Sequence, residues 1–167
     1  MGKKLGLYSE IKQIWGFEPY LEGKFGKGEV LLARFRSGAP AVGDELKRWE
    51  SKVGEVWKGG VCKVCKEGVV ETIKHVLLEC EAYRVERDEW EKSVKCVVSS
   101  VPGWAQADPM KLMLGWSQPN DSFRERAIML RASSRFLAAL WGARATMIHG
   151  PRDTSRGVKD PWGYGTK

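Results

Sequence analysis

The chain has 167 residues, of which 43% are hydrophobic and 10% aromatic, and it carries a net charge of +7. This length predicts one domain with tails at most, and the composition excludes an intrinsically disordered chain. No apolar run reaches the ~20 residues that a membrane-spanning helix needs, and no apolar segment follows the first lysines as in a signal peptide. We therefore expect an intracellular protein, nuclear or cytoplasmic, that is not secreted and has no contact with a membrane.

Apolar side chains at helical spacing predict three helices before the first cysteine, over residues 8–16, 29–37 and 44–56. The glycine-rich stretch 17–28 is typical of a loop. The segment 61–80, which holds the first three cysteines, is expected to form a short β-hairpin, or knuckle, and then the start of a helix.

After this segment the pattern is helical again, from Glu81 to Lys95. A proline-containing connection over 99–107 follows, and then a helical turn or two over 109–116. Cys96 has apolar neighbours, so we expect a buried free thiol there.

The longest helix is predicted from Ser122 to about His149. Ser122 and Glu125 have the spacing of a capping box, in which each side chain binds a backbone N–H at the start of the helix. Gly150 and Pro151 end the helix. Its apolar stripe comprises Phe123, Ala127, Leu130, Phe136, Leu137, Leu140, Met147 and Ile148.

The predicted fold is therefore mainly α: a small helical domain with a Cys-Cys-His-Cys knuckle in its middle and a long C-terminal helix. Its expected parts are an N-terminal helix and loop (1–28), the region that contains the Cys-Cys-His-Cys pattern (29–98), the connection with the long helix (99–150) and a disordered tail (151–167).

Four potential metal ligands have the spacing Cys62-x2-Cys65-x9-His75-x4-Cys80. Two cysteines separated by two residues can point both sulfurs into one turn, which supplies half of a tetrahedral site. On a continuous helix, five residues rotate by ~500°, so His75 and Cys80 would face different directions. We therefore expect the helix of His75 to end at or just before Cys80, and a new helix to start near Glu81.

All four positions of such a site are filled by protein, so the pattern predicts one structural Zn²⁺ with no place for a catalytic water. Three thiolates and a neutral imidazole around a divalent ion leave a charge of −1. The flanking Lys63, Lys66 and Lys74 favour such a charge, and the equally weighted alternative is that they are only part of the solvated surface. A redox pair of the thioredoxin type is the alternative for Cys62 and Cys65, but it requires strands and helices in alternation, which the pattern does not show.

These residues resemble the zinc-binding region that follows the reverse transcriptase domain of LINE-type (non-LTR) retrotransposons. The resemblance covers about residues 28–90. The residues that carry it are Leu31-Leu32-Ala33-Arg34-Phe35-Arg36-Ser37-Gly38, Trp49, Cys62-x2-Cys65, Glu71-Thr72-Ile73-Lys74-His75-Val76-Leu77-Leu78-Glu79-Cys80, Tyr83 and Arg87. The long helix, with Arg135-Phe136-Leu137 and Trp141, is similar to what often follows in such reading frames.

The resemblance implies a nucleic-acid-binding module that positions template RNA or target DNA, with the rest of a reverse transcriptase as a further partner. It also implies a fragment or a derivative of a retrotransposon protein. The paired aspartates of a polymerase do not occur in this sequence, so we expect no enzymatic activity from this chain.

The basic excess lies toward the two ends, since residues 62–100 carry 7 basic and 8 acidic side chains. A basic chain fits RNA or DNA as partner, although simple solubility explains a charge of this size equally well. Trp57 and Tyr83 are candidates for stacking on bases. The candidate phosphate contacts are Arg34, Arg36, Lys47, Arg48, Lys63, Lys66, Arg84 and Arg87. The alternative is a protein-interaction domain that zinc holds together and that has no role with nucleic acid.

Overall fold

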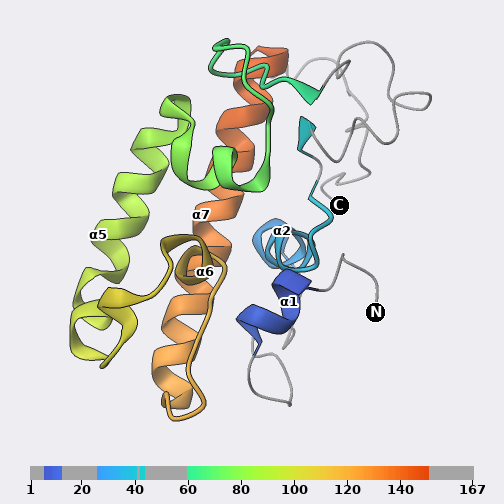
Figure 1. Cartoon of the computed structure of the whole chain (residues 1–167). Coiled ribbons are helices and arrows are strands. Elements are labelled where there is room, and N and C mark those ends of the chain that lie inside the picture. Colours follow the sequence, from blue (N-terminus) through green and yellow to red (C-terminus); the bar gives the residue numbers. More distant parts are fainter. Residues whose placement is uncertain (1–5, 13–25, 41, 44–59, 151–167) are drawn as a thin grey trace.

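The computed structural model describes residues 6–12, 26–40, 42–43 and 60–150, and these form a mainly helical fold (Figure 1). The predicted helix 44–56, the end of the helix 8–16 and the tail 151–167 lie outside the described residues. The described elements are α1 (Gly6–Ile11), α2 (Lys27–Arg36), η4 (His75–Glu79), η5 (Glu81–Tyr83), α5 (Arg84–Ser100), η6 (Trp104–Gln106), α6 (Pro109–Met113) and α7 (Phe123–His149).

Helix α7 is the centre of this fold, because both α2 and α5 pack against it. Helices α5 and α7 run side by side in opposite directions (Figure 1). On the α2 side, the rings of Phe35 and Trp141 meet edge to face with centroids 5.9 Å apart. On the α5 side, Trp90 lies 6.2 Å from Phe136. The apolar stripe of α7 is therefore covered from two sides.

Helices α2 and α7 approach each other closely at Gly28. A Cβ atom at this position would collide with the backbone oxygen of Ser134. The hydroxyl of Ser134, which is buried, donates a hydrogen bond of 2.7 Å to Glu29. Small side chains on both helices thus allow their backbones to come together, and a hydrogen bond fixes their relative position.

Both predicted ends of α7 are confirmed. The Ser122 hydroxyl accepts a hydrogen bond from the Glu125 N–H at 3.2 Å, and the Glu125 carboxylate accepts one from the Ser122 N–H at 2.7 Å. Gly150 ends the helix with a φ of 76°, which a glycine adopts without strain. Phe123 and Met147, expected in the apolar stripe, are 60% and 49% exposed because they lie at the two ends of the helix.

The segment that was expected to form a β-hairpin is instead a loop closed by a single antiparallel bridge between Val61 and Val70. Two backbone hydrogen bonds of 2.8 Å flank the bridge, from Cys62 to Val69 and from Glu71 to Gly60. Turn residues occupy the interval between the bridge residues, so no strand continues beyond the bridge.

The prediction for Cys96 is wrong, because this thiol is exposed. Helix α5 buries Trp90 and Val94, which are four residues apart and share one face. Cys96 follows Val94 by two residues, which turns it ~200° away from the buried face. Apolar neighbours in the sequence therefore did not indicate the side of the helix on which Cys96 lies.

Candidate metal centre

The structure brings the four predicted metal ligands together. One donor atom from each of Cys62, Cys65, His75 and Cys80 lies within 4.8 Å of every other donor atom. The Sγ atom of Cys65 is 3.6 Å from Nε2 of His75. Bonds of ~2.3 Å to sulfur and ~2.0 Å to nitrogen in a tetrahedral zinc site place donors roughly 3.5–3.8 Å apart. The donor set and its spacing therefore fit one tetrahedral metal ion.

A widened helical turn brings His75 and Cys80, which are five residues apart, to the same side of the backbone. Residues His75–Glu79 form one π-helical turn, η4, and the Cys80 N–H donates to the His75 carbonyl at 2.7 Å. This bond joins residues five apart, so the two ligands lie one turn from each other. Cys80 itself is extended, and η5 begins at Glu81. The predicted end of the helix before Cys80 and the new start at Glu81 are confirmed.

Hydrogen bonds outside the ligand set hold this turn in place. The N–H of His75 donates to the Thr72 hydroxyl at 3.0 Å, which caps the turn. The Arg87 guanidinium donates to the Cys80 carbonyl at 2.7 Å and so ties the start of α5 to the last ligand. Both bonds fix backbone positions at the ligands and reduce the reorganisation that metal binding requires.

The His75 ring has an acidic neighbour on its outer side. Because Nε2 faces Cys65, Nδ1 points toward Glu79, whose carboxylate lies 3.9 Å away. The other oxygen of Glu79 pairs with Lys74 at 2.7 Å, and this hydrogen bond lowers the pKa of Glu79. A carboxylate that accepts a hydrogen bond from the outer nitrogen of a ligating histidine orients the ring. At 3.9 Å the contact is too long for a hydrogen bond.

Burial disfavours the thiolate form of two ligands. Burial, with a smaller contribution from the charge of Glu71, raises the pKa of the Cys62 thiol. Burial raises the pKa of Cys80 to about 12. Both thiols are therefore protonated at neutral pH unless a cation lies beside them. A bound metal ion supplies that cation and releases the protons when it binds.

Glu71 and Arg144 form an ion pair next to the ligands, and the sequence-based site did not include it. Nε of Arg144 lies 3.2 Å from one oxygen of Glu71, and Nη2 lies 2.7 Å from the other. The two side chains are 0% and 8% exposed. A signal for Arg144 existed in the sequence, because Leu137, Leu140 and Trp141 precede it at the spacing of one helix face. A charged residue on an apolar helix face requires a buried partner.

Two predicted nucleic-acid contacts, Arg36 and Tyr83, lie inside the protein. Arg36 is 2% exposed, and its guanidinium carbon lies 5.6 Å from the centre of the Tyr8 ring. Tyr83 is 0% exposed, and burial raises its pKa. Neither side chain reaches a phosphate or a base in this arrangement. Their burial corrects the expectation that both face a ligand.

The remaining predicted contacts are divided between several places. Lys63 and Lys66 are exposed on the loop of the first two metal ligands. Arg84 is exposed and pairs with Glu81 at 3.1 Å. Arg87 is half-buried through its bond to Cys80, and Arg34 is half-buried in the last turn of α2. Lys47, Arg48 and Trp57 lie outside the described residues. Three of the described candidates, Lys63, Lys66 and Arg84, are therefore exposed, and of these Arg84 is held in an ion pair.

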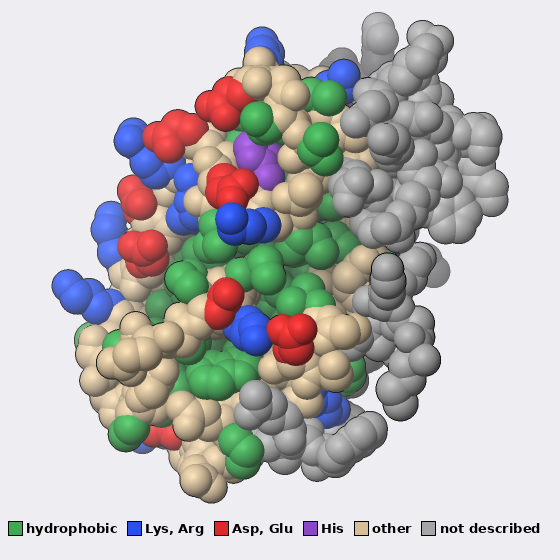
Figure 2. Space-filling view, in the orientation of Figure 1, with side chains coloured by type: hydrophobic (Ala, Val, Ile, Leu, Met, Phe, Trp, Pro, Cys, Tyr) green, Lys and Arg blue, Asp and Glu red, His purple; other side chains and the backbone are tan. Residues whose placement is uncertain are grey.

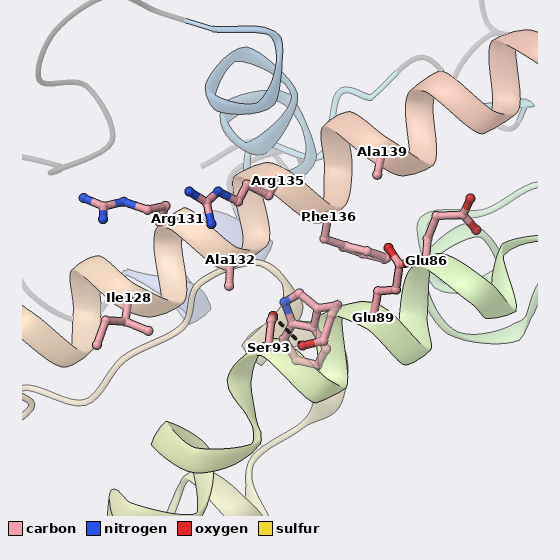
Figure 3. Close-up of a pocket in the computed structure, with 10 residues that line it drawn as sticks. Glu86, Glu89, Ser93, Ile128, Arg131, Ala132, Arg135, Phe136 and Ala139 are labelled. Carbon is pink, nitrogen blue, oxygen red and sulfur yellow. Dashed lines mark hydrogen bonds between the residues drawn. The ribbon is translucent and has the colours of Figure 1, made fainter.

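A groove of about 430 Å³ lies between α5 and α7, apart from the metal ligands. Figure 3 shows Arg131 and Arg135 extending from α7, with Glu86 and Glu89 on α5. Phe136 and Trp90 contribute buried aromatic rings to its lining. Acidic side chains on one wall oppose the binding of a phosphate chain along this groove.

Comparisons with known proteins identify no relative of this chain. No protein-family model, no curated protein and no solved structure matches it. Among the helices that the structure describes, none has both the length and the apolar character to cross a bilayer. The metal-ligand cluster is therefore the feature from which a function has to be argued.

Proposed function

We propose that this chain is a zinc-stabilised nucleic-acid-binding module without polymerase activity, derived from or belonging to a LINE-type reverse transcriptase. The observation that carries the proposal is the cluster of three cysteines and one histidine whose donor atoms lie within 4.8 Å of one another. Its position supports a structural role, since the loop, the η4 turn and the start of α5 all meet there.

Zinc is the metal that this donor set favours. Thiolate and imidazole ligands in a tetrahedral arrangement are typical of zinc, whereas calcium and magnesium prefer oxygen ligands. Four protein donors leave no open coordination position, which is the arrangement of structural sites. Three of the four ligands, Cys62, His75 and Cys80, are buried. A closed and shielded site of this kind supplies folding energy and no chemistry.

Nucleic acid as the partner is supported by the net charge of +7 and by the resemblance of residues 28–90 to the zinc-binding region of LINE-type reverse transcriptases. Lys63 and Lys66 are exposed on the metal loop and take part in none of the ion pairs between described residues. Phosphate contacts from such lysines release counterions, so the affinity for RNA falls as salt rises.

Two measurements test this proposal. Metal analysis of the purified chain is expected to give one zinc per chain. Titration of a short single-stranded RNA at increasing salt is expected to give a steadily falling affinity. Replacing Lys63 and Lys66 by glutamine is expected to weaken binding and to reduce the salt dependence by about one released ion per lysine. Lys92 and Lys95 are exposed on α5, so their replacement by glutamine is the matched control.

A protein-interaction module held by zinc is the second candidate. Figure 2 shows apolar side chains in the middle of one face, with basic and acidic side chains interspersed around them instead of gathered in one basic patch. An exposed apolar area favours a protein partner. A chain that holds zinc and yet binds neither RNA nor DNA at low salt would support this second candidate and exclude the first.

A further inference from the structure

We propose that the buried Glu71–Arg144 pair sets the charge beside the metal centre: Arg144 offsets the negative charge of Glu71 next to the bound thiolate and thereby makes the docking of α7 depend on metal binding. This inference rests on the proposed zinc site. It concerns residues outside the ligand set and links the cluster to a helix that contributes no ligand.

Glu71 uses both of its carboxylate oxygens. One oxygen accepts a hydrogen bond of 2.6 Å from the Gly43 N–H and one of 2.7 Å from Arg144. The other accepts from Arg144 at 3.2 Å and from the Cys62 thiol at 3.9 Å. A metal ligand and the guanidinium of α7 therefore share one carboxylate oxygen. Displacement of Glu71 would change the surroundings of Cys62 directly.

The surroundings of Glu71 leave it little freedom to move. Its side chain is 0% exposed, and its backbone N–H donates to Gly60 at 2.8 Å beside the bridge that closes the metal loop. A Cβ atom at Gly43 would lie 2.5 Å from the Gly60 oxygen and 3.0 Å from Cβ of Glu71. Three parts of the chain, at Gly43, at the metal loop and at α7, are thus packed around one carboxylate.

Metal binding changes the charge at this point. The bound Cys62 is a thiolate, and a site with three thiolates, one neutral histidine and Zn²⁺ carries a charge of −1. The carboxylate of Glu71 then faces a negative centre across a contact of 3.9 Å. Repulsion at this distance is strong in a buried environment unless a cation is present. Arg144, with both nitrogens on Glu71 and its guanidinium 4.8 Å from the centre of the Trp141 ring, supplies that cation.

Glu71 and Arg144 are therefore expected to have opposite effects on the affinity for zinc. Arg144→Met leaves an uncompensated carboxylate beside the thiolate, so zinc is expected to bind at least about tenfold more weakly. Glu71→Gln leaves a cation beside the thiolate, so zinc is expected to bind as tightly as in the unchanged chain or more tightly. The double variant, which lacks both charges, is expected to return to within about threefold of the unchanged chain.

The experiment measures zinc affinity of the full chain at neutral pH by competition with a chromophoric chelator. Arg144→Met loses both hydrogen bonds between the two side chains, and Glu71→Gln loses at least one, because its amide keeps a single acceptor oxygen. A purely structural role would therefore lower the affinity in both variants. Equal losses in the two variants, or no change in either, would overturn the proposal. If Arg144→Met does not fold, Arg144→Lys replaces it. This variant keeps the charge but gives up the two-pronged contact of the guanidinium with Glu71. Because the argument requires only a cation at this place, zinc affinity is expected to stay within about threefold of the unchanged chain, and a tenfold loss would contradict it.

The coupling to α7 has its own readout. Amide hydrogen exchange in α7 around Arg144 is expected to be slower with zinc than with chelator, and this difference is expected to shrink in Arg144→Met and in the double variant. Equal zinc-induced protection in all variants would overturn the coupling. An unchanged chain that binds no zinc would refute the proposed function itself. This outcome is distinct from a zinc affinity that does not change when Glu71 or Arg144 is replaced.

Discussion

Replacement of Cys80 by alanine tests the metal centre most directly. Cys80 is 0% exposed and ends the turn that begins at His75, so its sulfur is the donor that connects η4 to α5. The substitution removes one of four donors and few buried atoms. Its main expected effect is therefore the loss of the stability that zinc supplies. Cys96, which is exposed on α5, offers a matched control in the same kind of residue.

The size of the stabilisation lost in Cys80→Ala follows from the linkage between zinc binding and folding. Free zinc at a thousand times its dissociation constant stabilises the folded state by about 4 kcal/mol. For a chain of this length 1 kcal/mol corresponds to about 2–4 °C in Tm, so zinc is expected to raise Tm by about 8–16 °C. Thermal unfolding with zinc and with chelator measures this difference. We expect it in the unchanged chain and in Cys96→Ala, and we expect most of it to disappear in Cys80→Ala. A zinc-dependent Tm shift that survives in Cys80→Ala would refute the four-ligand site.

Three further predictions concern the start of α7, the metal loop and the hydrophobic core. Ser122→Ala removes the capping box and is expected to cost about 1 kcal/mol in unfolding free energy, measured by urea unfolding. The bonds to Ser122 lower the pKa of Glu125 from its ordinary 4.5, so this stabilisation is present above that pH and is lost as the pH falls through the lowered pKa. Glu125→Gln is expected to remove this part of the pH dependence, and an identical profile would contradict the capping role. Lys66 has a φ of 61°, so Lys66→Gly is expected to raise Tm by a few degrees, and a fall in Tm would contradict the expectation that the backbone is strained at this position. Leu137→Ala empties a fully buried position in α7 and is expected to cost about 2–5 kcal/mol, whereas a loss below 1 kcal/mol would contradict its place in the core.

The elements that the sequence predicted well are those whose determinants are local. A capping box and a terminal glycine define α7 at both ends, and each needs only neighbouring residues. The break between His75 and Cys80 followed from the rotation of a helix per residue, which is also local. The sequence did not predict the form of this break, which is a π turn with a hydrogen bond between residues five apart.

The predictions that failed depend on contacts between distant segments. Arg36 is an arginine in a basic stretch, and nothing in its own sequence neighbourhood shows that it points toward Tyr8. Glu71 and Arg144 are 73 positions apart, so their pairing could not be derived from spacing. Cys96 shows the converse error, because the helix face and not the apolar neighbours in the sequence decides whether this thiol is buried.

The long separation between Glu71 and Arg144 also bears on the order of folding events. Cys62 and Cys80 are 18 positions apart, whereas the contact from Glu71 to α7 closes a loop of 73 positions. Closing the longer loop costs about 1.2 kcal/mol more in chain entropy. Local contacts form faster than distant ones, so the metal loop is expected to assemble early and α7 to dock afterwards. A nascent chain would thus acquire its metal-binding loop before its central helix is in place.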